Sequence, residues 1–91
     1  MPEAFAWDER KRISNLEKHG IDFRDAIAIF DYPHLTFASQ HAGEPRQVSL
    51  GRIGPALAAV VWTDRDGVVR IISARAARRN EREAYDARFK T

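Results

Sequence analysis

The sequence predicts an α+β fold in one domain over residues 1–91, and three observations lead to this prediction. A chain of 91 residues is long enough for one hydrophobic core, whereas two cores would each fall below the size that usually folds unaided. Its residues are 44% apolar and 31% charged, which is typical of a globular protein. The apolar residues have helical spacing up to Pro33 and strand-like spacing over most of the chain beyond it. We therefore expect a strand, two helices, a mostly antiparallel meander sheet of about four to five strands in total, and a final helix.

The N-terminal residues predict a strand followed by a helix. The apolar stretch Phe5–Trp7 is expected to form an edge strand. Asp8 suits the N-cap position, because its carboxylate can accept hydrogen bonds from the free backbone N–H groups of the first helical turn. The helix is expected to run to about His19, with Ile13 and Leu16 on its inward face.

A second helix is expected directly after the first. Gly20 is the residue best able to take the left-handed conformation that ends a helix. Asp22 can start the next helix, and Asp25 adds negative charge at its positive N-terminal end. Pro33 stops this helix. Apolar residues recur at i, i+3, i+4 and i+7, so the helix is expected to bury one stripe, consisting of Phe23, Ala26, Ile27 and Phe30.

The sheet is expected to come after Pro33. Leu35–Ser39 and Gln47–Ile53 have the composition of strands with interspersed polar residues. Leu57–Thr63 is apolar on both faces, which indicates a central strand. Asp66-Gly67 predicts a tight hairpin, since both central positions of such a turn need positive φ.

The hairpin predicts which residues of its two strands pair, and strand alternation predicts the sides to which Arg70 and Arg75 point. A two-residue loop pairs Arg65 with Val68, Thr63 with Arg70, and Trp62 with Ile71. Both tryptophans, Trp7 and Trp62, are expected in the core rather than as platforms for nucleobases. Arg70 and Arg75 are an odd number of residues apart, so a regular strand would point them to opposite faces.

The C-terminal segment is expected to form a basic helix from about Arg78 to Phe89, with Tyr85 and Phe89 on one side. From Arg70 to Thr91 the chain has seven basic and three acidic residues, whereas residues 20–69 have four basic and six acidic ones. Basic ends around a nearly neutral middle can form a phosphate-binding surface, although an arginine-rich helix can equally be a solvated one.

Other features of the sequence exclude whole classes of protein. The absence of cysteine excludes a disulfide scaffold, a thiolate zinc site and a cysteine nucleophile. The longest apolar run, Pro55–Trp62, is too short to cross a membrane. The start Met1-Pro2-Glu3 has no basic or apolar export segment, so we expect a cytoplasmic protein. His34 and His41 lack the partners of a zinc site, and we expect neither metal nor cofactor.

Three stretches of the sequence resemble a known family. The first stretch consists of Trp7-Asp8, Lys11, Asn15, Glu17-Lys18-His19-Gly20-Ile21, Phe23 and Ala26. The second consists of Gly43-Glu44-Pro45-Arg46 and Leu50-Gly51. The third consists of Trp62-Thr63, Arg70-Ile71-Ile72-Ser73-Ala74-Arg75, Glu81 and Tyr85. Together they resemble the BrnT toxins of type II toxin–antitoxin systems over nearly the whole chain. The resemblance implies a RelE-like fold and a ribonuclease that acts on RNA and inhibits translation. It also implies neutralisation by a DNA-binding antitoxin, BrnA, so that this chain would contact DNA only indirectly, through the antitoxin.

Two positions depart from the pattern of that family. The family usually has a basic residue where this chain has Ala76, and a threonine where it has Arg78. A threonine at that position would form a capping box with Glu81, but an arginine side chain cannot accept those hydrogen bonds. Arg79 is a candidate to replace the basic residue that is missing at position 76. The departures leave open a second hypothesis, in which the chain is a weak or inactive module that binds RNA or antitoxin.

Cleavage of RNA without a metal requires a base, an acid and cations directed at the phosphate. The attacking group is the 2′-OH, so such an enzyme cuts RNA and spares DNA. Arginine suits the cation role because its planar guanidinium donates two parallel hydrogen bonds to phosphate oxygens. The candidate catalytic residues are His19, Arg70, Arg75, Glu81 and Tyr85, and the candidate RNA-binding residues are Lys11, Lys18, Arg78, Arg79 and Arg82.

Each catalytic candidate also has a purely structural interpretation. His19 can act on the helix C-terminus, where a positive charge is favourable. Arg75 can form an ion pair with Glu81 or Glu44, and Glu81 can orient Arg75 instead of serving as a base. Arg70 can be an exposed cross-strand partner of Thr63. Tyr85 can supply a hydroxyl, stack on a base or fill core space with Phe89. A third hypothesis is therefore a protein that only captures a partner.

Overall fold

The computed structural model describes residues 4–41 and 43–90, and the side chains of residues 4–40 and 43–90. The start Met1-Pro2-Glu3, from which we inferred the lack of an export segment, and the side chain of His41 lie outside this part. The elements are, in order, β1 (Phe5–Trp7), α1 (Glu9–His19), α2 (Phe23–Ala26), the 3₁₀ helix η1 (Ile27–Asp31), β2 (Leu35–His41), β3 (Glu44–Ile53), β4 (Ala56–Arg65), β5 (Val68–Ala76) and α3 (Arg79–Arg88). This order confirms the predicted α+β fold.

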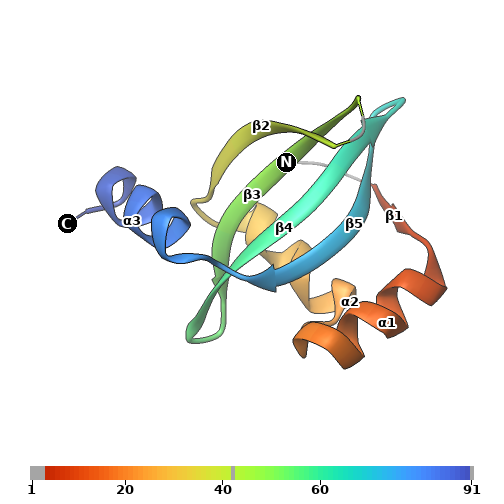
Figure 1. Cartoon of the computed structure of the whole chain (residues 1–91), viewed down its shortest axis with the longest axis horizontal. Helices are drawn as coiled ribbons and strands as arrows, with labels where there is room; N and C mark the ends of the chain where they lie inside the picture. The colour runs from red at the N-terminus through yellow and green to blue at the C-terminus, as the bar shows by residue number, and fades with distance from the viewer. Residues whose placement is uncertain (1–3, 42, 91) are drawn as a thin grey trace.

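The five strands form one sheet in the order β1-β5-β4-β3-β2 (Figure 1). β1 runs parallel to β5, and the remaining pairs are antiparallel. β4 lies at the centre, as its two apolar faces predicted. The hairpin is also confirmed, with Asp66 at φ 55° and Gly67 at φ 83°, and all three predicted pairs occur in its register. The strands extend beyond the predicted ends, because antiparallel pairing continues toward the turns through polar residues.

The predicted facing of Arg70 and Arg75 is wrong because β5 contains a β-bulge. Trp62 of β4 pairs with Ile71, and the preceding Val61 pairs with Ser73, so Ile72 has no partner. An extra residue in one strand shifts the alternation of all side chains beyond it. Arg70 therefore pairs with Thr63 and Arg75 with Ala59, two positions of β4 that point to the same face.

The main core lies between the sheet and the segment formed by α2 and η1. The buried side chains of this core come from both layers and include Phe23, Ala26, Ile29, Phe30, Val60 and Ile71. Trp7 and Trp62 pack against them, as expected. The backbone of β3 approaches η1 closely at Gly51, where an added Cβ would lie 2.7 Å from the Cβ of Ile29.

The second predicted helix is only partly α-helical. Its first turn is α2, and from Ile27 the chain continues as the tighter 3₁₀ helix η1 until Asp31, two residues before Pro33. A 3₁₀ helix has about 3.0 residues per turn, which brings different side chains to the buried side than an α-helix would. As a result Ile29 is fully buried, whereas Ile27, which we placed in the stripe, is only partly buried.

The inward positions predicted for α1 are also wrong. Ile13 and Leu16 are 47% and 40% exposed, and Asn15 is the buried residue of this helix. β1 pairs with β5 only as far as Ile71, so the backbone of Ala74 has no neighbouring strand on that side. Asn15 takes the place of that strand: its amide donates to the Ala74 carbonyl at 2.8 Å and accepts from the Ala74 N–H at 3.1 Å. A polar residue therefore docks α1, because it meets polar backbone groups.

Candidate active site

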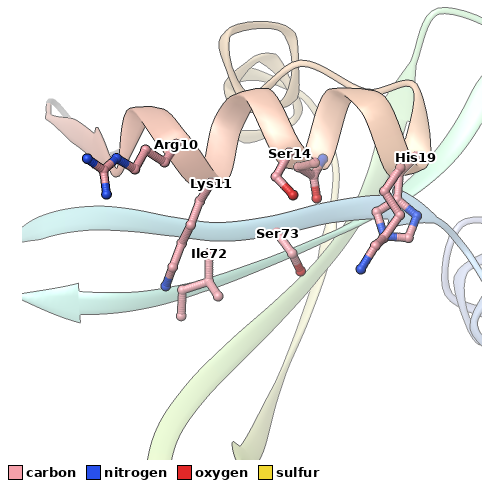
Figure 2. Close-up of a pocket in the computed structure, with 8 residues that line it drawn as sticks. Arg10, Lys11, Ser14, His19, Ile72 and Ser73 are labelled. Carbon is pink, nitrogen blue, oxygen red and sulfur yellow. The ribbon is translucent and has the colours of Figure 1, made fainter.

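α1 and β5 enclose a groove of about 380 Å³. We call it the α1–β5 groove; it is lined by Arg10, Lys11, Ser14, Asn15, Lys18, His19, Ile72 and Ser73. Figure 2 shows Lys11 and His19 of the helix on the same side as the Ile72 and Ser73 side chains of the strand. The groove therefore brings together three predicted site residues, namely Lys11, Lys18 and His19, and its lining contains no carboxylate.

The local sequence explains how α1 presents these cations. Asp8 caps the helix by accepting hydrogen bonds from the N–H groups of Arg10 and Lys11, at 2.8 and 3.4 Å. Lys11, Asn15 and Lys18 are spaced by four and three residues, which places them on one side of a helix. Gly20 ends α1 in the left-handed conformation at φ 71°, so that His19 occupies its last turn. That position also fits the structural interpretation of His19, in which its charge acts on the helix C-terminus.

The second part of the site is the sheet face that carries Val48, Leu50, Ala59 and Val61, on the opposite side from α2 and η1; we call it the open face. Because of the bulge, Arg70, Ser73 and Arg75 all belong to this face. Their partners on β4 are Thr63, Val61 and Ala59, so Arg70 and Arg75 are about 13 Å apart along the strand. Ser73 also lines the α1–β5 groove, and the groove and the open face therefore meet at this residue.

Arg75 is held by Glu81 of α3 in a two-bond ion pair. Nη1 donates to Oε1 at 2.7 Å and Nη2 donates to Oε2 at 3.0 Å, while the Glu81 side chain is 8% exposed. The hydrogen bonds from Arg75 lower the pKa of Glu81, and the N–H of Arg78 lowers it further, against the opposing effect of burial. The same hydrogen bonds raise the pKa of Arg75. Both groups are therefore charged at neutral pH, as the structural interpretation of this pair predicted.

The remaining candidates lie along α3. Arg78 is the N-cap and its side chain makes no capping hydrogen bond, as its chemistry predicted. Glu81 nevertheless accepts from the Arg78 N–H at 2.8 Å, which is one half of a capping box. Arg79 pairs with Glu83 at 3.2 Å with both side chains exposed, and Arg82 donates to the Ala77 carbonyl at 2.8 Å. Tyr85 packs on the cluster of Val48, Leu50 and Ala59.

Six of the ten predicted residues form two groups, and Arg70 lies apart from both, near the hairpin end of the open face. Lys11, Lys18 and His19 line the α1–β5 groove, whereas Arg75, Glu81 and Tyr85 belong to the contact between β5, α3 and the open face. None of the described pockets is lined by residues of both groups. Five groove residues were not among the predicted site residues, namely Arg10, Ser14, Asn15, Ile72 and Ser73, although the last three belong to the stretches that carry the family resemblance. Arg10, Ser14 and Asn15 have helical spacing along α1, and this spacing could have indicated a polar inward face. The prediction instead placed the apolar Ile13 and Leu16 on that face.

The chemistry available at this site is that of cations, one imidazole and hydroxyls. Among residues 4–41 and 43–90, no group of three or more His, Cys, Asp or Glu side chains is placed to hold a metal ion. In the same part of the chain, no helix has the length and apolar character needed to cross a membrane. Arginine and lysine side chains around a groove are suited to bind the phosphates of a nucleic acid.

Comparison with known proteins identifies the family. The model of the family described as the ribonuclease toxin BrnT of type II toxin–antitoxin systems matches residues 7–81. A 1.1 Å crystal structure of the ribonuclease toxin BrnT from Brucella abortus is similar to this fold, with a TM-score of 0.68 and 28% sequence identity. That similarity covers 84% of this chain and 97% of the Brucella chain. No curated protein matches the sequence. With the family match extending over most of the described fold, this chain belongs to the BrnT family of ribonuclease toxins of type II toxin–antitoxin systems.

Proposed function

We propose that residues 1–91 act as one domain that cleaves RNA without a metal, inhibits translation in the cytoplasm and is neutralised by a BrnA-type antitoxin. Family membership supports the ribonuclease activity. The observation that supports the site is the arrangement of Arg70, Ser73 and Arg75 on one face, in continuity with the groove that holds His19.

In this proposal the 2′-OH loses its proton and attacks the adjacent phosphorus, a 2′,3′-cyclic phosphate forms, and the bond between phosphorus and the 5′-oxygen breaks, so that this oxygen leaves with a proton. Negative charge develops on the phosphate oxygens during this step. Arg75 stabilises that charge and Arg70 assists from the same face, while Glu81 holds the Arg75 guanidinium in a fixed orientation. A carboxylate with a lowered pKa is a weak base, which favours this positioning role for Glu81 over proton abstraction.

The other candidates have roles around the phosphate. His19 accepts the proton of the 2′-OH or donates a proton to the leaving 5′-oxygen, because imidazole can serve as base or as acid, and water takes the other role. Tyr85 supports the site from α3, one helical turn after Glu81, where it packs on Val48, Leu50 and Ala59. The cations of α1 and of the α3 region bind flanking phosphates; they are Lys11, Lys18, Arg78, Arg79 and Arg82.

The antitoxin is proposed to cover the same cations. An acidic or amphipathic segment would compete with RNA for the α1–β5 groove and the open face, and this chain would contact DNA only through that partner. The proposal predicts that added antitoxin releases bound RNA from the toxin.

The test is cleavage of purified RNA in the presence of a chelator. The wild-type protein should cut RNA, leave the matching DNA intact and stop a cell-free translation reaction. Arg75→Ala should lower the cleavage rate about 100- to 1,000-fold, as loss of one charge-stabilising donor does in other enzymes. Arg65→Ala removes an exposed arginine beside the hairpin turn and is the matched control. RNA that remains intact in the presence of wild-type protein would contradict the proposal.

A second candidate function is binding without cleavage. It is favoured by the engagement of Arg75 with Glu81 and by Ala76, which stands where the family pattern has a basic residue. This alternative predicts tight, salt-dependent RNA binding with no loss of full-length RNA. A third possibility, capture of a protein partner alone, predicts an RNA affinity no better than that of a neutral control protein.

A further inference from the structure

A second cavity, of about 570 Å³, lies at the opposite end of α3 from the Arg75–Glu81 ion pair. It is formed by the end of η1 and the loop after it, the turn after β3, and the C-terminal half of α3. We call it the aromatic pocket; its lining consists of Tyr32, Pro33, Arg52, Gly54, Tyr85 and Phe89. None of these residues lines the α1–β5 groove.

The aromatic pocket combines ring faces with guanidinium groups. The Tyr85 and Phe89 rings contact each other with centroids 4.8 Å apart. Arg52 lies over the Tyr85 ring at 5.8 Å, and Arg88 lies over the Phe89 ring at 5.2 Å. Tyr32 is 66% exposed, which is unusual for a large aromatic side chain and leaves its ring available to a ligand.

The charge of the lining favours an anionic ligand. Among the described residues that line the pocket, Arg52 is the only charged side chain and none is a carboxylate. Asp31 and Asp86 are chain neighbours of the pocket tyrosines but are not part of the lining. Aromatic rings together with arginine, without a carboxylate, form the surface on which unpaired nucleobases stack while their phosphates are neutralised.

We propose that the aromatic pocket binds one unpaired nucleobase of the RNA substrate, with the base stacked on the exposed ring of Tyr32 and its phosphate paired with Arg52. This inference rests on the proposed function for the identity of the ligand as RNA. The cavity volume lies within the range of about 300–1,000 Å³ that is common for small-ligand sites, and it accommodates a nucleotide.

The position of the pocket relative to Arg75 suits a substrate that reaches both. α3 contacts Arg75 through Glu81 near its first turn and lines the pocket through Tyr85 and Phe89. The helical rise from Glu81 to Phe89 is about 12 Å. At about 3.4 Å per stacked nucleotide, three to four nucleotides span that length. An RNA whose phosphate lies at Arg75 can therefore place a nearby base in the aromatic pocket.

The test measures binding of an RNA that cannot be cleaved. A fluorescent 2′-O-methyl oligonucleotide lacks the attacking hydroxyl, so its anisotropy reports affinity independently of catalysis. Tyr32→Ala should weaken binding about 5- to 100-fold, the usual effect of losing one base–aromatic stack. Tyr32→Trp should retain the affinity, because it keeps a ring face. The control is Ile13→Ala, which removes another large exposed apolar side chain, on α1 and outside the pocket, the α1–β5 groove and the open face.

A series of abasic oligonucleotides makes the test specific for a base. With wild-type protein, one abasic position should reduce affinity as much as Tyr32→Ala does, and the Tyr32→Ala variant should no longer distinguish that oligonucleotide from the intact one. Urea unfolding of each variant verifies that the fold is retained. Equal RNA affinities of wild type and Tyr32→Ala would overturn the inference. It would also be overturned if Tyr32→Ala lost affinity equally for intact and abasic RNA, or if the wild-type protein did not bind the oligonucleotide.

The outcome also separates this inference from the proposed function. Metal-independent cleavage by wild-type protein together with unchanged binding by Tyr32→Ala would leave the proposed function standing and refute the pocket. Base-dependent binding without RNA cleavage would support the pocket and refute the proposed cleavage activity. If Tyr32→Ala and Arg52→Ala abolished binding of the antitoxin and left RNA affinity unchanged, the pocket would be a protein-docking site and the inference would be wrong.

Discussion

At the scale of single residues, Asn15 determines the width of the α1–β5 groove. Its amide donates to the carbonyls of Ile21 and Ala74 at 2.9 and 2.8 Å and accepts from the Ala74 N–H. The side chain is thus bonded both to the loop directly after its own helix and to the strand opposite. Because His19 and Lys18 lie on the same helix within about one turn of Asn15, these bonds also fix their position relative to Ser73.

We predict that Asn15→Ala destabilises the fold by about 2–4 kcal/mol, because two buried backbone groups of Ala74 lose their partners. The measurement is urea unfolding of both proteins. Ser14→Ala, on the same helix but at an exposed position, is the control and should change stability little. An unfolding midpoint of Asn15→Ala equal to that of wild type would show that water replaces the amide at no cost.

Gly51 is a second residue whose identity the packing requires. We predict that Gly51→Ala destabilises the protein by about 1–3 kcal/mol, because the new methyl group would overlap Ile29 of η1 in a fully buried contact. Thermal and urea unfolding check this expectation. A variant as stable as the wild type would mean that η1 can move away from β3 freely.

At the scale of elements, an ionic cluster joins α1 to α2. Asp22 caps α2 and accepts hydrogen bonds from Arg24 and from Arg12 of α1, at 2.9 and 2.8 Å from its Oδ2. Arg12 also pairs with Glu9 within α1. The hydrogen bonds from the side chain and backbone of Arg24, with the nearby arginine charges, lower the pKa of Asp22 from 3.8 to about 2.

The lowered pKa predicts a specific acid sensitivity. Asp22 is ionised more readily in the folded chain than in the unfolded one, so its contribution to stability is complete above pH 3.8 and is lost as the pH falls toward about 2. We predict that wild-type stability falls more steeply than that of Asp22→Asn over this interval. Asp86→Asn, which removes an exposed carboxylate of α3, serves as the control in unfolding at stepwise pH. Parallel pH profiles of wild type and Asp22→Asn would contradict this assignment.

The elements that could be predicted from the sequence are those set by local signals. Asp8 and Gly20 predicted both ends of α1, and Asp66-Gly67 predicted the hairpin and its register. The inward face of α1 could not be predicted from apolar residues, because this face meets polar backbone groups of Ala74. On that side these groups bond to the Asn15 side chain instead of to a strand. The change to 3₁₀ geometry after Ala26 has no signal in the apolar spacing, and the 3₁₀ segment packs closely on β3 at Gly51.

The candidate site was predictable in its residue types but not in its geometry. The family motif indicated His19, Arg70 and Arg75 as candidates, and their roles still await a test. The facing of Arg70 and Arg75 depends on the bulge at Ile72, for which the sequence has no local signal such as glycine. Exposed aromatic residues such as Tyr32 become a candidate site only when the fold brings η1, β3 and α3 together.

At the scale of the whole molecule, the sheet separates the main core from the proposed site on the open face. The main core lies on the side of α2 and η1, whereas the opposite face carries Arg70, Ser73 and Arg75 and is covered at one end by Tyr85. Substituting the arginines of the open face therefore leaves the main core intact. The net charge of +2 is small, so attraction of RNA depends on where the cations lie rather than on their excess.

The central claim is that Arg70 and Arg75 act together on one phosphate from one face of the sheet. The most direct measurement is the single-turnover rate of RNA cleavage, in chelator, for wild type, Arg70→Ala, Arg75→Ala and the double variant. Residues that act on the same group are non-additive, so the double variant should be slowed by clearly less than the product of the two single effects. Rate losses that multiply, or an Arg70→Ala variant as fast as the wild type, would contradict the claim.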